Sequence, residues 1–155
     1  MALKPDRDYN ESSDISQRWS SAGDQAPKAK GGIACVETQG SGVALGSTVN
    51  VVRYAVDPSG AIPKGILLQD VVATPSNGIK NFQSLEVWPG EAVTLVTKGW
   101  VVTNMITGSA PAVGDVAYVA ASGLISKTQA TGAKAIGRFE TTLDADGYAK
   151  VSILL

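Results

Sequence analysis

The stretch Glu91-Ala-Val-Thr-Leu-Val-Thr-Lys-Gly-Trp-Val-Val-Thr-Asn-Met105 decides how the rest of the sequence is interpreted. From Val93 to Lys98, β-favouring residues alternate in the manner of a strand with two different faces. Gly99 interrupts the run, and Trp100 resumes it. A glycine inside such a run suggests a bulge or a bend. The pattern therefore predicts one long bent strand, or two short ones, at the centre of an all-β body.

The sequence from residue 33 onward repeats the same order of short strand, Gly- or Asp-rich turn and short strand. Strands are expected at residues 33–38, 49–56, 65–72, 116–120, 124–127, 133–142 and 148–155. Turns are expected at Asp57-Pro-Ser-Gly60, Pro75-Ser-Asn-Gly78, Trp88-Pro-Gly90 and Asp144-Ala-Asp-Gly147. Strands repeating at roughly 8–12 residues indicate a small β-sandwich or β-barrel-like body.

The bulk composition indicates one soluble domain. A chain of 155 residues is long enough to bury a core. Its net charge of -1 gives no global attraction for nucleic acid or an anionic membrane, and neither partner is expected. The N-terminus lacks the apolar region of a signal peptide, and no run approaches the ~18 apolar residues of a membrane span. We therefore expect synthesis in the cytoplasm.

Residues 1–32 differ in kind from the rest and are interpreted as an extended N-terminal arm and linker, with the β-rich domain at 33–155. Ten of residues 1–30 are charged, five basic and five acidic. Apolar side chains are few, and such a segment does not offset its own ordering entropy. The arm is either a disordered leader or a segment that orders against another surface, and its apolar residues favour the second.

Three residues of this arm are its candidate anchors, namely Tyr9, Ile15 and Trp19. Asp14 could cap a short helical turn, which would place Ile15 and Trp19 on one face at i, i+4 spacing. Deleting residues 2–22 should leave the β body folded but weaken attachment to the partner surface sharply.

Residues for catalysis are scarce. The sequence has no histidine, which removes His-dependent nucleophiles and metal sites. The single Cys35 cannot form an internal disulfide and is expected to be a small buried hydrophobe. The run Gly40-Ser-Gly-Val-Ala-Leu-Gly46 lacks the spacing of a phosphate loop and predicts a turn. A carboxylate pair of the glycosidase kind could be hidden among Glu37, Asp57, Asp70, Glu86, Glu91 and Asp115.

Two further motifs have a structural and a functional interpretation. Asp144-Ala-Asp146-Gly147 is similar to the start of a calcium loop but lacks the terminal glutamate, so a hairpin turn is preferred. Trp88 and Trp100 could form a sugar platform, although core packing or contact with another subunit is preferred. No enzyme activity, cofactor, metal or small-molecule substrate is expected.

Several segments after residue 65 resemble the small head decoration (cement) proteins of tailed bacteriophages. The similar segments are Gly65-Ile-Leu-Leu68, Thr97-Lys-Gly-Trp-Val-Val102, Ala112-Val-Gly-Asp-Val-Ala-Tyr-Val119, Ala135-Ile-Gly-Arg-Phe-Glu140 and Asp146-Gly-Tyr-Ala-Lys-Val-Ser-Ile-Leu154. They are strand and turn patterns and contain no catalytic signature.

The resemblance implies a function outside catalysis. It implies a structural protein that binds the exterior of the virion, contacts the major capsid protein, cements adjacent subunits and forms a homotrimer. The alternative is a carbohydrate- or receptor-binding β module of a fibre or tail appendage. Sugar binding would require exposed coplanar aromatic rings, whereas cementing would place aromatic side chains at subunit or capsid contacts.

Overall fold

The protein is nearly all β in a computed structural model that describes residues 3–4, 12–21, 26–37, 50–73, 78–79 and 86–155. Strands account for 48% of these residues, and no helix among them reaches seven residues. The all-β prediction is confirmed.

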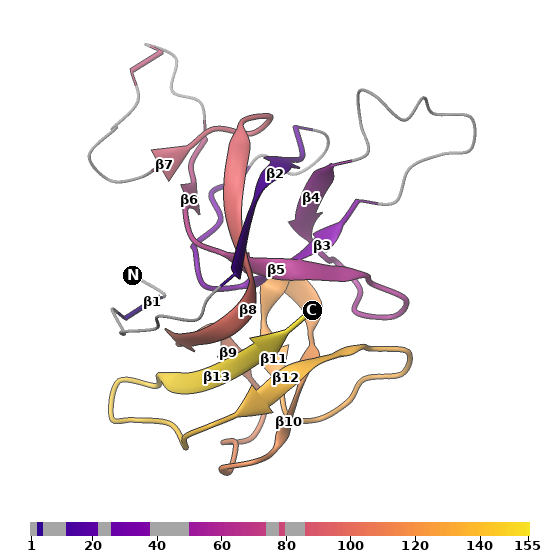
Figure 1. Cartoon of the computed structure of the whole chain (residues 1–155), viewed down its shortest axis with the longest axis vertical. Helices are drawn as coiled ribbons and strands as arrows, with labels where there is room; N and C mark the ends of the chain where they lie inside the picture. The colour runs from indigo at the N-terminus through magenta and orange to yellow at the C-terminus, as the bar shows by residue number, and fades with distance from the viewer. Residues whose placement is uncertain (1–2, 5–11, 22–25, 38–49, 74–77, 80–85) are drawn as a thin grey trace.

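Five strands close into a small barrel in the upper half of Figure 1. Around the ring they are β2 (Ser12–Trp19), β4 (Val51–Tyr54), β3 (Ile33–Val36), β5 (Pro63–Leu67) and the first half of β8 (Ala92–Thr103). Strand β2 pairs in parallel with β4 and antiparallel with β8, which closes the ring. Closure gives each of these strands a hydrogen-bonded neighbour on both sides, although β2 pairs with β4 only at Arg18 and Trp19.

The same hydrogen-bonded sheet continues from the second half of β8 into the lower half of Figure 1, and we call this part the second sheet. Its order continues with β13 (Ala149–Leu154), β12 (Ala135–Phe139), β10 (Val116–Val119), β11 (Ile125–Ser126) and β9 (Ile106–Thr107). Strands β12 and β13 are antiparallel neighbours, as the predicted closing hairpin requires. Strand β1 (Leu3–Lys4) pairs with the other edge of β8.

Strand β8 runs through both halves, which confirms the predicted long central strand. It bends at Gly99, whose φ of 129° favours glycine. Val96 and Val101 lie in the same core although Val101 follows Val96 by five positions, an odd offset. Side chains of a straight strand alternate between faces, so the bend must turn β8 between these two valines.

Two hydrophobic cores share the wall between the halves. One core fills the barrel and consists of Trp19, Ala34, Val52, Tyr54, Leu67, Val71, Val87, Val93 and Leu95. The other core lies between the outside of the barrel wall and the second sheet. The barrel wall contributes Ile33, Cys35, Ile66 and Val96, and the second sheet contributes residues such as Phe139, Val151 and Ile153. Strands β3 and β5 are therefore buried on both faces, which explains the predicted continuous apolar run near Ile66.

Smaller elements complete the fold. Strands β6 (Asp70–Val71) and β7 (Glu86–Val87) form a parallel pair. A 3-10 turn, η2 (Ala121–Gly123), lies between β10 and β11.

The N-terminal segment differs from the expected separate arm. Residues Ser12–Trp19 form a strand of the barrel wall, and the helical turn expected at Asp14 is wrong. Pairing with β4 and β8 supplies backbone hydrogen bonds that override the weak local helix signal. The sheet continues across the boundary expected at residue 32, because β2 and β3 belong to the same barrel. Deleting residues 2–22 would therefore remove a wall strand, so the expectation of an intact body after this deletion is also corrected.

Candidate functional site

Strand β2 carries a β-bulge that controls which side chains reach the surface. Asp14 lies opposite Leu95 and Gln17 lies opposite Val93, so three steps on β2 match two on β8. The side chain of Ile15 is 72% exposed, whereas Gln17 is 3% exposed. Bulges commonly re-aim a side chain at functional positions. This bulge presents Ile15 outward and turns Gln17 into the protein.

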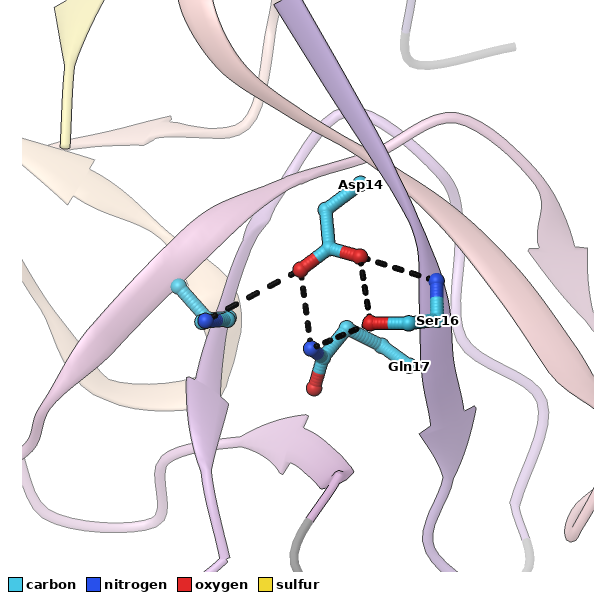
Figure 2. A network of polar contacts seen from close by, with 4 residues as sticks. Asp14, Ser16 and Gln17 are labelled. Atoms are coloured by element: carbon cyan, nitrogen blue, oxygen red, sulfur yellow. Dashed lines mark hydrogen bonds and ion pairs between the residues drawn. The ribbon is translucent and has the colours of Figure 1, made fainter.

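A polar network built on Asp14 holds the bulge in shape (Figure 2). Asp14 Oδ1 accepts hydrogen bonds from the Ser16 backbone N–H at 2.8 Å and from the Ser16 hydroxyl at 2.6 Å. Asp14 Oδ2 accepts from Gln17 Nε2 at 2.9 Å. Lys64 Nζ on β5 lies 3.8 Å from the same oxygen. The Ser16 hydroxyl bond is the main reason that the pKa of Asp14 is lowered, although partial burial of the carboxyl acts against it.

Trp19 is a core residue in this fold. Its side chain is 4% exposed, and its ring meets Tyr54 edge to face with centroids 5.1 Å apart. The prediction that it is an exposed anchor is therefore corrected, because the bulge shifts the facing of β2 between Ile15 and Trp19. Tyr9, the third expected anchor, lies outside the described residues.

Tyr54 joins the two halves of the molecule, which sequence reasoning missed. Its hydroxyl donates to the backbone carbonyl of Ala29, and burial raises the pKa of its phenol. Its ring lies against Gly32 and Gly123: a Cβ on Gly123 would come within 2.5 Å of Tyr54 Cδ1, and one on Gly32 within 2.8 Å of its hydroxyl oxygen. The glycines are the only sequence signal for this slot, and nothing local pairs them with Tyr54.

Trp100 lies half-buried on the outer face of the second sheet. It is opposite Ser152 in the β8–β13 register. Lys150 Nζ lies 3.5 Å from the centroid of its ring, a cation–π contact. The ammonium therefore occupies one face of the indole, which leaves less of the ring available for stacking on a sugar.

Trp88 lies at the other end of β8, before the predicted Pro89-Gly90 turn. Gly90 has a φ of 88°, and the Glu91 side chain accepts from the Trp88 backbone N–H at 2.7 Å. A strand rises about 3.3 Å per residue, so the part of β8 before its bend, from Ala92 to Lys98, spans roughly 20 Å and places Trp88 and Trp100 towards opposite ends of this strand. The structure does not bring the two tryptophans together as one platform.

The candidate acidic residues make local contacts. Asp57 accepts from the Ser59 backbone N–H at 2.8 Å, as expected of its turn. Asp70 accepts from the Lys30 backbone N–H at 2.8 Å, and Glu37 lies 3.4 Å from Arg53. Asp115 accepts from the Ala112 backbone N–H at 2.9 Å and lies 3.9 Å from Lys127. Glu86 lies on β7. Most of these carboxylates thus stabilise turns and ion pairs.

The remaining sequence motifs have structural roles where they are described. Asp144 Oδ1 accepts backbone hydrogen bonds from Asp146 and Tyr148, and Gly147 has a φ of 80°, which confirms the predicted turn. Cys35 is 2% exposed, and burial raises the pKa of its thiol to about 11, as fits the predicted buried hydrophobe. The glycine-rich run at 40–46 lies outside the described residues.

Features of ligand sites are sparse. Within the described ranges, no group of three or more His, Cys, Asp and Glu residues could hold a metal ion. No helix there is both long and apolar enough to span a membrane. A surface pocket of about 250 Å³ lies where the halves meet, with Lys28 and Arg53 among its lining residues. Since Arg53 is paired with Glu37, the charge of this pocket is partly balanced.

Comparison with known proteins points to a structural protein of phage particles. The model of a family described as "Structural cement protein (E217 gp24/Pam3 gp6)" matches residues 7–154. No curated protein matches the sequence. The match spans both the barrel and the second sheet, and it includes strand β2.

Proposed function

The chain belongs to the phage structural cement protein family, and we propose that it binds the outside of the head and cements adjacent major capsid protein subunits. The observation that carries this proposal is the family match over residues 7–154, because it covers the complete described fold apart from its ends. Family membership itself implies a structural role in the virion. The proposal adds the partner, the exterior surface and the bridging of subunits.

The side chain that best suits a contact with the shell is Ile15. It is 72% exposed on a bulge that Asp14 braces, so its position is fixed before binding. Fully burying a side chain of this size is worth roughly 1.5–3 kcal/mol. A pre-ordered contact also loses less conformational entropy on binding than a flexible one. Ile15 is therefore proposed as a capsid contact, while Trp19 supports it from the core.

The proposed assembly is a homotrimer, as the resemblance to decoration proteins implies. Three linked copies make the second and third contacts intramolecular, and such avidity gains ~10²–10⁴ over one site. Modest contacts such as Ile15 would then suffice to hold the protein on a shell.

Reconstitution on heads that lack the protein tests this proposal. Purified protein is titrated onto such heads, and bound copies are counted after sedimentation. We expect saturable binding by the wild type and weaker binding by Ile15→Ser. Arg18→Ser, on the same strand and also exposed, serves as the matched control.

The outcomes separate the parts of the proposal. Absence of wild-type binding at saturating concentration would overturn the cement function. Equal occupancy by wild type and Ile15→Ser would overturn only the role of Ile15. Both variants should show the wild-type circular dichroism spectrum, since each changes an exposed side chain.

A further inference from the structure

The outer face of the second sheet gathers cations on three adjacent strands. Lys98 lies on β8, Lys150 on β13 and Arg138 on β12. The strand register places them on one face. Lys98 is opposite Leu154 and Lys150 is opposite Val102, while Ser152 lies between Trp100 and Arg138. On these strands, residues that point away from the core alternate with core residues. We call the surface that they form the cationic face and define it by Lys98, Trp100, Val102, Arg138, Lys150, Ser152 and Leu154.

The charge of this face differs from that of the whole protein. The chain has a net charge of -1 and a pI near 5.3. Three of the seven defining residues are cationic, and the other four are uncharged. Glu140 also alternates with a core residue, Phe139, and its backbone N–H donates to the Lys150 carbonyl at 2.8 Å, so its exposed carboxylate belongs to the edge of this face. Among the residues that the structure describes, this single carboxylate leaves the face with a positive balance.

The centre of the face has the make-up of a binding hot spot. Trp100 is half-buried beneath Lys150, whose ammonium lies 3.5 Å from the ring centroid. Leu154 is 70% exposed and adds apolar area at the edge. Tryptophan and arginine are enriched among residues that dominate binding energy, and a cation held on an aromatic ring needs less ordering when a partner arrives.

We propose that the cationic face docks onto a carboxylate-rich patch of the major capsid protein. This inference rests on the proposed function and adds the face and the chemistry of the partner surface. A second copy packed face to face would bring Lys98, Arg138 and Lys150 against their own equivalents, since a twofold interface is self-complementary. Such like-charge contact is unfavourable, so an acidic partner fits better.

Charge reversal on the assembled system tests the proposal. The variant Lys98→Glu/Arg138→Glu is titrated onto heads that lack the protein, at about 50 and 500 mM NaCl. The matched control is Arg18→Glu/Arg53→Glu, which makes the same charge change on the barrel; because Arg53 pairs with Glu37, circular dichroism and thermal unfolding check that this control is folded before it is titrated. We expect the face variant to bind about tenfold more weakly than wild type at low salt. Wild-type affinity should fall as salt rises, and the variant should lose most of this dependence.

Other results would overturn the inference in distinguishable ways. If the face variant bound heads as tightly as the wild type does, another surface would be the docking surface, and the cement function would stand. An equal loss in the barrel control would show a non-specific charge effect. If the face variant changed its oligomeric state in sedimentation but its trimers bound heads with unchanged affinity, the face would be assigned to contact between copies. Absence of binding by the wild type would instead overturn the proposed function itself.

Discussion

At the scale of single residues, Tyr54 shows how closely the two halves are fitted. It belongs to the barrel core, yet its ring lies against Gly123 of the second half. A contact of this kind joins segments that are distant in sequence. Pattern analysis identified Tyr54 only as part of a strand, because alternation reports which face a residue occupies but not its partner on that face.

Replacing Gly123 tests this slot. Gly123→Ala should destabilise the protein more than Gly60→Ala, because both positions have positive φ, 77° and 70°, but only Gly123 is crowded by Tyr54. We expect ~1–2 kcal/mol for the left-handed backbone alone, and ~1–3 kcal/mol more from the clash at Gly123. Urea unfolding of the two variants measures the difference. Equal losses would contradict the tight packing of the slot.

Asp14 makes the stability of the bulge depend on pH. Its folded pKa lies below the ordinary value of 3.8, so the ionised carboxyl stabilises the fold above that value. This contribution disappears as the pH falls through the lowered folded pKa, because the folded state then also binds the proton. We expect Asp14→Asn to be less stable than wild type at neutral pH. The difference should narrow towards about pH 2 in unfolding experiments.

The neighbours of Asp14 provide the control for that prediction. Ser16 is the largest cause of the lowered pKa, and Lys64 is the smallest. Ser16→Ala should therefore raise the pKa of Asp14, measured by carboxyl NMR titration, more than Lys64→Met does. A stability difference between wild type and Asp14→Asn that stays constant down to acid pH would contradict the proposed role of this carboxylate.

At the scale of elements, β2 and β8 show where sequence patterns succeed and fail. The alternation and Gly99 predicted one long bent strand or two short ones, since both signals are local, and the structure has the first. Strand β2 was interpreted as part of an arm because residues 1–30 are rich in charged residues, a composition typical of unfolded segments. Its buried position comes from pairing with β4 and β8, which are distant in sequence. Ile15 and Trp19 were grouped by spacing, but the bulge between Asp14 and Gln17 separates their environments.

The opposite environments of Ile15 and Trp19 give a matched pair of predictions. Trp19→Ala should cost ~3–5 kcal/mol, because it empties part of the barrel core. Ile15→Ala should change stability by less than ~0.5 kcal/mol, as expected for an exposed side chain. Chemical denaturation measures both, and Trp19→Phe provides a milder variant if Trp19→Ala does not fold. Similar losses for the two alanine variants would contradict the facing of β2.

At the scale of the whole molecule, the sequence predicted the fold class and the family more readily than the contact surface. Strand and turn spacing is a property of the chain, and the family resemblance rests on the same patterns. The cationic face depends on the register of β8, β13 and β12, which brings Lys98, Arg138 and Lys150 together from distant segments. Only Trp100 among its members was singled out from sequence.

Assembly is the next prediction at this scale. We expect the purified protein to sediment as a homotrimer at micromolar concentration or above, as the resemblance to decoration proteins implies. Such a trimer would also let modest contacts hold on a shell through multivalent attachment. Analytical ultracentrifugation over a range of concentrations measures this directly. A monomer at every concentration, together with isolated copies on decorated heads, would contradict trimer formation.

The central claim is that this protein stabilises a phage head, and heat stability of the head tests it most directly. DNA-filled heads without the protein are heated alone or after saturation with it, and DNA release is followed with a dye excluded by intact shells. The account predicts release at a higher temperature from the saturated heads, with Ile15→Ser giving a smaller shift at the same protein concentration. Release at the same temperature from bare and fully occupied heads would contradict the account.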